Sequence, residues 1–487
     1  MIDPQTFAGN APTGEMPFQA VEELRKALTA GQTYNIQDQS GGQALRIQSL
    51  DKTMQAVIQD NQHFRLFNLL PKPNASATVD EWTEQSGVGG FLGGTTNTET
   101  GDIRESTGTY TRRVGLVKYL MTKRQVSFVL TLQNNLADAE AIEYANGALQ
   151  LLTDAEFLCF EGDSSVVTTE FDGLYKQMTD LGSTAHIIDL RGTPLASQHA
   201  IVQAAALISG YGNFGTPTDL FLSQQTQADL DNGLDPAFRV PLPDVGAGGV
   251  SLGAPVVGVR TSWGNIRTQP DVFIRDEAMQ CPMETLHPTL TAANSTYAGN
   301  ASVAITAQQT GAVAGSRWTA AQAGWYRYGV AAVGPAGESD IIAGDTAAEI
   351  TQAGDSLTVT ITAGTAAGTG WAIYRSAKCA SEVAAEAVTD ADLRLIKRIP
   401  AATTTFVDKN EDIPGTSKAY VLNLAPSATA ITWRQLMPMV KFPLYPTTSA
   451  VIPWAQLLFG YLRISKRRHC SVIKNILPNS AVWRPFG

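Results

Sequence analysis

The chain has 487 residues and a formal net charge of −10, from 35 Lys and Arg against 45 Asp and Glu. This length exceeds what one compact core usually holds, so two or three domains are expected. The acidic balance argues against a dedicated nucleic-acid-binding protein. The longest apolar run, residues 451–462, contains Pro453 and is too short to span a bilayer.

The four cysteines (Cys159, Cys281, Cys379 and Cys470) are far apart and have no paired-ligand spacing. We expect them to be reduced, buried thiols of a protein made in a reducing cytosol. The first ten residues, MIDPQTFAGN, lack the basic start and apolar run of an export signal.

Residues 1–77 have the composition of an N-terminal arm. Amphipathic helices are predicted at 17–30 and 49–61, and the apolar run 63–70 ends at Pro71. These segments hold too little apolar surface for a core of their own, so the arm should lie on another surface.

Residues 78–130 predict an extended hairpin. A strand over 78–84 and a longer one over 107–130 flank the Gly- and Thr-rich stretch 87–101. A two-stranded hairpin is barely stable alone, so a neighbour should hold it. The glycines do not form a nucleotide site, because Leu92 replaces the third motif glycine and no Lys-Ser/Thr follows.

A long helix is predicted over 134–163, within a segment 131–165. It has no proline, no Lys or Arg, and one interior glycine. One reading is an amphipathic helix with a solvated acidic face. The other is a spine helix whose acidic face meets a basic strand or subunit. The apolar stripe comprises Ala141, Ala145, Ala148, Leu152, Ala155 and Cys159, and the acidic residues are Asp138, Glu140, Glu143, Asp154, Glu156, Glu161 and Asp163.

Residues 166–287 alternate helical and strand patterns, which is typical of an α+β domain. Helices are predicted at 196–210 and at 224–232 after a Ser223 cap. The predicted strands are 217–222, 254–259, 264–269 and 271–274.

Residues 288–425 change to Ala, Thr and Gly with strict period-two alternation, as in Leu357, Val359 and Ile361. This pattern predicts a β-sandwich of roughly a hundred residues. Its strands, among them WYRYGVAAVGPAGESD and WAIYRS, resemble those of fibronectin-type-three or immunoglobulin-like modules.

Residues 426–487 return to the first composition, with strands predicted at 431–445 and 457–464. This tail has eight basic residues and no Asp or Glu, so residues 1–425 carry −18. The basic run 463–469 fits a solvated strand edge, or else a seat for an acidic neighbouring surface or for DNA phosphate. The basic residues of the tail are Arg434, Lys441, Arg463, Lys466, Arg467, Arg468, Lys474 and Arg484.

No catalytic, cofactor-binding or metal site is predicted, and an enzyme is not expected. The sequence contains no Gly-x-Ser-x-Gly elbow, His-Glu-x-x-His or Walker motif. The histidines (His63, His186, His199, His287 and His469) are scattered without metal-ligand spacing.

The order of these parts resembles the major capsid protein of tailed bacteriophages, with the Hong Kong ninety-seven phage fold. The residues that carry the resemblance are EFDGLYKQ at 170–177, PTDLFLSQQTQADL at 217–230 and GAPVVGVRTSWGNIRTQPDVFI at 253–274. It covers residues 1–287 and 426–487. It implies an N-terminal arm (1–77), an extended hairpin loop with peripheral-domain strands (78–130) and the spine helix of the peripheral domain (131–165). It also implies an axial domain with peripheral-domain strands (166–287) and return strands (426–487), with 288–425 inserted and displayed outside.

The resemblance also implies a function. Such proteins assemble into hexamers and pentamers of an icosahedral shell around double-stranded DNA, which they contact without sequence specificity. The expected location is the virion, assembled in the host bacterial cytoplasm without membrane contact. Scaffolding, portal and decoration proteins are the implied partners. This chain departs from the pattern in lacking a long charged helical N-terminal scaffolding segment, so scaffolding would be a separate protein or a cleaved segment.

Two other classes remain open from the residues alone. One is another phage structural protein, such as a tail-tube, sheath or decoration component with an immunoglobulin-like module. The other is a carbohydrate-active enzyme with an appended fibronectin-like domain. An appended module normally lies at a terminus, whereas here it interrupts two halves of one domain.

Overall fold

The computed structural model describes residues 61–132, 138–180, 186–233, 256–278, 304–335, 337–362, 368–445 and 449–486. The chain divides into two units, Met1–Val57 and Ile58–Gly487, and every described residue belongs to the second. The helix predicted at 17–30, nearly all of that at 49–61, the loop 246–253 and Cys281 lie outside the described residues.

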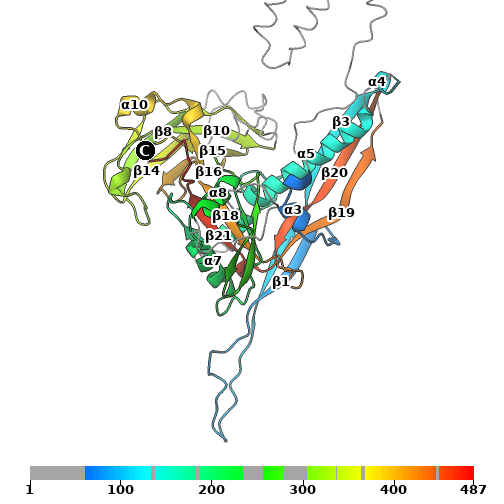
Figure 1. Ribbon diagram of the computed structural model, residues 1–487, viewed down its shortest axis with the longest axis vertical. Coiled ribbons are helices and arrows are strands. Elements are labelled where there is room, and N and C mark those ends of the chain that lie inside the picture. The colour runs from blue at the N-terminus through cyan, green and yellow to red at the C-terminus, as the bar shows by residue number, and fades with distance from the viewer. Residues whose placement is uncertain are drawn as a thin grey trace, which may run out of the picture. The chain divides into compact units, whose positions relative to one another are not determined.

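The long predicted helix is α5 (Ala139–Glu161), which packs on a three-stranded antiparallel sheet in the order β19-β20-β3 (Figure 1). The strands are β19 (Ile431–Pro443), β20 (Val451–Ile464) and β3 (Lys118–Ser127). The helix begins after Asp138, whose carboxylate accepts the backbone N–H of Glu140 at 3.0 Å.

The buried face of α5 differs from the predicted stripe. Ala141 and Ala145 are exposed, and the buried residues are Gly147, Leu151, Ala155 and Cys159, with Glu156 and Phe160 beside them. Gly147 is required by close packing, because a Cβ there would lie 2.1 Å from Gln456 Oε1. The predicted stripe is therefore confirmed at Ala155 and Cys159 and wrong in its first half, where Gly147 and Leu151 are buried instead.

The extended hairpin consists of β1 (Val79–Gly87) and β2 (Thr109–Leu116), paired antiparallel. The single strand predicted over 107–130 is wrong. It breaks at buried Val117 into β2, which pairs with β1, and β3, which pairs with β20, and it ends in the short helix α4 (Phe128–Leu132).

A second sheet is mixed and six-stranded, in the order β4-β21-β18-β5-β7-β6. The predicted helices appear as α7 (His199–Ser209) and α8 (Gln224–Gly233), and Ser223 Oγ accepts the Thr226 N–H at 3.3 Å as the cap. Residues 271–274 are a turn, not the predicted strand. The strands are β4 (Ile187–Asp189), β5 (Asp219–Leu222), β6 (Gly258–Thr261), β7 (Gly264–Pro270), β18 (Ser417–Leu422) and β21 (Ser471–Ile476), and α6 (Leu174–Thr179) packs nearby.

The described residues of 304–408 form mainly β-strands and connecting loops, as the alternation predicts, with one short helix, α10. A five-stranded sheet (β11-β10-β15-β16, with β12 on β10), a three-stranded sheet (β17-β14-β8) and the pair β13-β9 share one core. The elements are β8 (Ala304–Ala312), β9 (Gly324–Tyr326), β10 (Tyr328–Gly334), β11 (Gly337–Glu338), β12 (Ile342–Ala343), β13 (Ala348–Ile350), β14 (Asp355–Thr362), β15 (Gly370–Arg375), α10 (Glu382–Glu386), β16 (Arg394–Pro400) and β17 (Thr405–Asp408).

This module is not an independent appendage. Strands β10 and β15 are buried along their whole length, because Trp371 and Ile373 face the module core while Tyr374 packs on the opposite face with Val166 and Val167. The expected end of the segment at residue 425 also differs, since β18 pairs with β5 and β21 in the six-stranded sheet.

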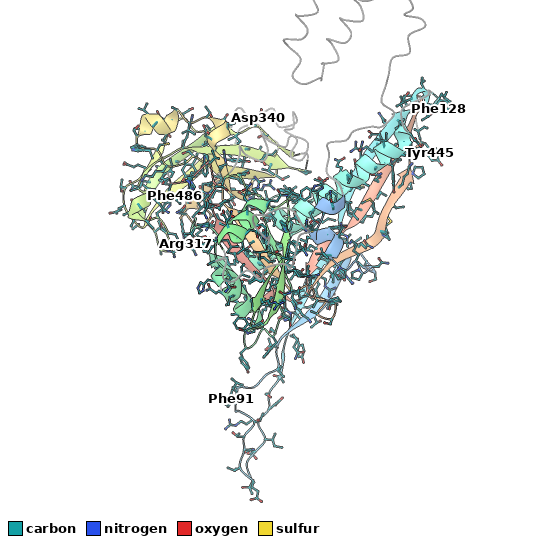
Figure 2. The ribbon with its side chains drawn as sticks, viewed as in Figure 1. Phe91, Phe128, Arg317, Asp340, Tyr445 and Phe486 are labelled. Carbon is teal, nitrogen blue, oxygen red and sulfur yellow. The ribbon has the colours of Figure 1, made fainter. Side chains whose placement is uncertain are left out.

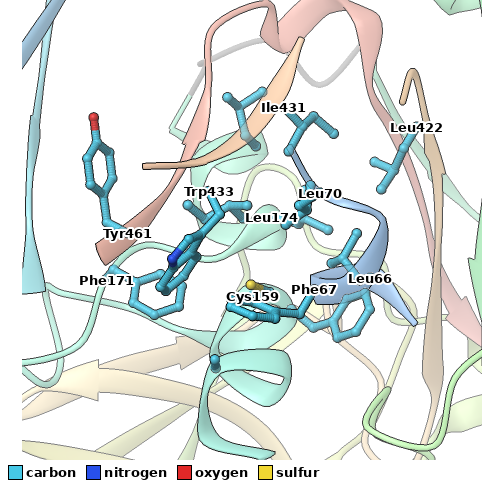
Figure 3. Packing of buried hydrophobic residues seen from close by; sticks show 14 of the residues in the cluster. Leu66, Phe67, Leu70, Cys159, Phe171, Leu174, Leu422, Ile431, Trp433 and Tyr461 are labelled. Carbon is cyan, nitrogen blue, oxygen red and sulfur yellow. The ribbon is translucent and has the colours of Figure 1, made fainter. Parts of the chain in front are cut away.

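The central core joins residues 64–75, the end of the predicted arm, to α5 and the return strands (Figure 3). Trp433 receives the rings of Phe67 at 5.1 Å and Phe171 at 5.3 Å, both edge-on. Cys159 and Cys470 are fully buried free thiols, as expected, whereas free Cys379 is only half-buried.

Candidate subunit interface

One face of the β1–β2 hairpin packs on the rest of its unit, and the other face is open to solvent. In the paired register, Asp80, Trp82 and Glu84 alternate with Val79, Glu81, Thr83 and Gln85. Asp80 is buried, and Gly115 on the same face lies over Tyr461, where a Cβ would approach the phenol oxygen to 2.3 Å. The other face exposes apolar side chains along both strands: Val79, Tyr110, Val114 and Leu116.

The tip between β1 and β2 is also apolar and exposed. Ile103 is 95% and Val88 86% exposed, and Phe91 and Leu92 are similarly open. Figure 2 shows Phe91 on the projecting loop, away from the layered core of its unit. Gly89 adopts φ +91°, and a Cβ there would meet the Thr107 carbonyl oxygen at 2.4 Å, so glycine is needed where the strands cross into the tip.

One buried carboxylate anchors the root of the hairpin. Asp80 accepts hydrogen bonds from Arg434 Nε at 3.0 Å, Tyr461 O–H at 2.7 Å and Arg463 at 3.1 Å. Burial works against its charged form, but these three donors outweigh that effect and lower the pKa of Asp80 below its usual value. Arg463 also stacks on Trp82, with its guanidinium carbon 4.6 Å from the ring centroid.

The three-stranded sheet presents a second open apolar surface, on the side away from α5. Tyr119 and Met121 of β3 are more than half exposed, and Tyr119 contacts Phe459 of β20 edge-on at 5.1 Å. Val440 and Phe442 of β19 pair with Leu457 and Ala455 and are exposed too. At the far end, exposed Phe128 and Tyr445 lie close together in the view of Figure 2.

Residues 64–70 of the predicted arm lie on another surface, as expected, and that surface is the central core of the same unit. Phe64, Leu66, Phe67 and Leu70 are buried in the central core. Glu156 of α5 holds this segment, with one carboxylate oxygen 2.7 Å from the Leu66 N–H and the other 2.7 Å from that of Phe67. Burial, followed by the nearby carboxylate of Asp271, raises the pKa of Glu156 to about 9.

The acidic helix meets basic strands within the same chain. Lys441 of β19 pairs with Glu140 at 2.5 Å, Arg124 of β3 with Glu143 at 3.3 Å, and Lys418 with Glu161 at 2.8 Å. These pairs favour the interpretation in which the acidic face of α5 meets basic strands, and they lie within one chain.

The basic run 463–469 is only partly a solvated edge. Arg463 binds Asp80, and Arg467 is half-buried, donating to the Gln177 carbonyl at 3.3 Å. Lys466 and Arg468 are exposed. These partners come from elements far away in sequence, so no local pattern could have revealed them.

No group of acidic, His and Cys side chains within the described residues could hold a metal ion. Of the scattered histidines, His186 and His469 are brought together around Asn213, while His287 lies outside the described residues. None of the described helices is long and apolar enough to cross a membrane. Open apolar surfaces such as those of the hairpin and the three-stranded sheet are typical of proteins that function in assemblies.

Comparison with known proteins supports that class and makes it specific. No protein-family model matches the chain. The chain is 24% identical to the "Major capsid protein" of Staphylococcus phage S25-3, over 93% of this chain and 95% of that protein. It is equally identical to the "Putative major capsid protein" of Enterococcus phage phiEF24C, with the same coverage.

A solved capsid of a native GTA particle covers 91% of this chain and is fully covered itself, at 10% identity and a TM-score of 0.45. A score below 0.5 does not by itself establish a shared fold. The sequence likeness to phage capsid proteins, which spans nearly the whole of both chains, supports a structural and non-enzymatic role as a capsid protein.

Proposed function

We propose that this chain is the major capsid protein of a tailed bacteriophage, and that it assembles into hexamers and pentamers of an icosahedral shell enclosing double-stranded DNA. The observation that carries the proposal is the nearly full-length likeness to curated phage major capsid proteins. The proposed fold is that of the Hong Kong ninety-seven phage, with the arm, hairpin, α5 and its sheet, and the six-stranded sheet as its parts.

The open apolar surfaces fit this function. A projecting two-stranded hairpin gains stability only when another surface covers it. Its apolar face and tip match the apolar side of the β19-β20-β3 sheet in character, so each hairpin would lie on that sheet of a neighbouring copy. Many such modest contacts per subunit add up to a large, obligate interface.

The β-module between residues 304 and 408 is proposed to be immunoglobulin-like and to lie on the outer shell surface. Its tight packing against residues 163–170 favours a fixed orientation in the subunit. Scaffolding, portal and decoration proteins are proposed as further partners. DNA contact would be non-specific, in keeping with a tail in which Arg434, Lys441, Arg463 and Lys474 are ion-paired within the chain.

The experiment targets the hairpin tip. Replacing residues 88–108 with Asn-Gly closes the hairpin at the Gly87–Thr109 pair and keeps the β1–β2 register. The shortened chain should fold, with unchanged circular dichroism and thermal midpoint, but negative-stain microscopy should show no closed shells.

A triple substitution at the tip provides the finer test. Phe91→Ser with Leu92→Ser and Ile103→Ser should also abolish shells, whereas Val383→Ser, an equally exposed aliphatic residue on the module, should not. Shells of normal size from either tip variant would refute the role of the hairpin.

A further inference from the structure

The loop between α7 and β5, residues 210–217, presents two aromatic rings to solvent. Tyr211 is 76% and Phe214 71% exposed, and their rings stack edge-on with centroids 5.5 Å apart. Phe214 has a φ of +51°, a left-handed conformation that a bulky residue rarely adopts. Such strain persists only where surrounding contacts enforce it.

Hydrogen bonds fix the shape of this loop from within. The Phe214 N–H donates to the Gly210 carbonyl at 3.2 Å, and the Gly215 N–H donates to that of Ile208 at 2.9 Å. The Asn213 amide nitrogen donates to the Leu207 carbonyl at 2.8 Å. Rigidly held, exposed aromatic side chains are the usual anchors of protein interfaces.

His469 stabilises the loop through two hydrogen bonds, and it must be neutral to make both of them. Its Nε2 lies 2.9 Å from the Asn213 carbonyl oxygen, to which it donates, and its Nδ1 lies 3.2 Å from Asn423 Nδ2. The Asn423 amide cannot be reversed, because its Oδ1 accepts the Ala425 N–H at 3.2 Å. Nδ1 of His469 therefore accepts a hydrogen bond and carries no proton.

His186 is held in the same way. Its Nδ1 donates to the Cys470 carbonyl at 3.1 Å, and its Nε2 faces Asn213 Nδ2 at 3.4 Å. The bond to the Leu207 carbonyl fixes Nδ2 of Asn213 as a donor, so His186 Nε2 is the acceptor. Both histidines thus depend on an asparagine amide whose orientation an independent backbone group determines.

The surroundings also favour the neutral forms. Burial first, and then the cations Arg468 for His186 and Lys466 for His469, keep the pKa of each histidine below its usual value. The two rings also oppose each other's protonation. The thiol of Cys470, the residue after His469, has a pKa raised to about 12 by burial and stays protonated.

We propose that loop 210–217 is a contact surface for a second copy of this chain, and that two neutral histidines hold it in shape, so that acid weakens the contact. The second copy rests on the proposed function. Residues 210–218 contain no charged side chain, so the two rings suit an apolar surface of another copy, while the exposed cations Lys466 and Arg468 belong to the neighbouring segment and not to the loop.

Protonation would place an N–H group against an asparagine N–H at each histidine. Because the folded-state pKa is lowered, the support is complete above the usual histidine pKa of about 6.5 and is lost as the pH falls below it. Each histidine can shift the open-to-closed ratio of the loop by up to about tenfold per pH unit in that window.

The contact is tested by Tyr211→Ser with Phe214→Ser in the full chain. At pH 7.5 the double variant should need a roughly tenfold higher protein concentration to assemble than wild type, as measured by light scattering. Val383→Ser is the control and should leave the concentration unchanged. Equal assembly of wild type and the double variant would overturn the contact.

The histidine support is tested on unassembled subunits by hydrogen exchange at Gly215 and Asn213. Protection relative to intrinsic exchange should fall about tenfold or more between pH 7 and pH 5 in wild type. In His186→Asn with His469→Gln, which keep a donor but do not titrate, it should not change. An equal fall in both proteins would overturn the histidine role.

These outcomes separate the inference from the proposed function. If wild type forms no shells or capsomers under any condition, the proposed function fails and the contact fails with it, while the exchange measurement still decides the histidine role. If wild type forms shells and the loop variant does too, only the contact is overturned.

Discussion

Two acidic side chains hold distant parts of this chain in place, Asp80 as a carboxylate and Glu156 with a raised pKa of about 9. Asp80 joins the hairpin to strands more than 350 positions later, through Arg434 and Arg463. Glu156 joins the segment 64–70 to α5 through two backbone N–H groups. Both are nearly or fully buried, so each acts where water cannot replace it.

Asp80→Ala should destabilise the fold by about 2–4 kcal/mol, because it leaves two guanidinium groups and a phenol without their acceptor. The measurement is urea unfolding of assembly-incompetent subunits. Glu81→Ala is the matched control, since its pairing with Arg112 is solvent-exposed and should contribute less than about 0.5 kcal/mol. Equal losses in the two variants would rule out a special role for Asp80.

The Glu156–Asp271 pair predicts an unusual pH dependence. Because the pKa of Glu156 is raised in the folded state, the folded protein binds more protons than the unfolded chain between about pH 4.5 and pH 9. The free energy of unfolding should therefore fall as the pH rises through that window. Asp271→Asn removes the like charge beside Glu156 while keeping a side-chain oxygen that can accept the Phe273 N–H, which lies at 2.8 Å from the Asp271 oxygen. We expect a smaller loss of thermal midpoint from pH 6 to pH 9 in this variant; an unchanged slope would contradict the pairing.

At the scale of elements, local patterns predicted what local chemistry determines. Spacings of three and four between apolar residues predict the helices α5, α7 and α8, and a spacing of two predicts β14. The residue type at Ser223 predicts the helix cap. The break at Val117 could not be predicted, because residues 107–130 form one continuous β-pattern. The two halves separate only because β20 pairs with the second.

The open hairpin was predictable in outline and not in detail. Glycine and threonine content indicated a flap that needs a neighbour, and the exposed tip agrees with that. The Asp80 cluster could not be found, because its partners lie on β19 and β20 and nothing in the spacing links them. The same holds for β18, whose place in the six-stranded sheet depends on β5 and β21.

The C-terminal segment fastens the β-module to the rest of the subunit. The Lys378 N–H donates to the Pro485 carbonyl at 2.9 Å, and the Phe486 ring meets Trp318 of the module core edge-on at 6.3 Å. Phe486→Ala should therefore lower the stability of the module by about 1–3 kcal/mol.

Protease resistance of residues 304–408 under mild denaturation is the measurement for this variant. Val482→Ala, an exposed residue on the same segment, should change nothing. Loss of resistance in the Val482 variant alone, or in neither, would show that the segment does not secure the module.

At the scale of the whole molecule, the described residues combine a well-packed core with apolar surfaces that the subunit leaves open. The core joins α5, the return strands and the segment 64–75, while the hairpin tip and one side of the three-stranded sheet remain exposed. Open apolar surface of this kind is typical of proteins that function in assemblies.

Sedimentation of the purified full-length chain, followed by negative-stain microscopy of each fraction, tests this most directly. We predict capsomer-sized particles and closed shells, with little material remaining as single subunits at high concentration. A stable monomer at high concentration, with its first seventy residues resistant to protease, would contradict the account.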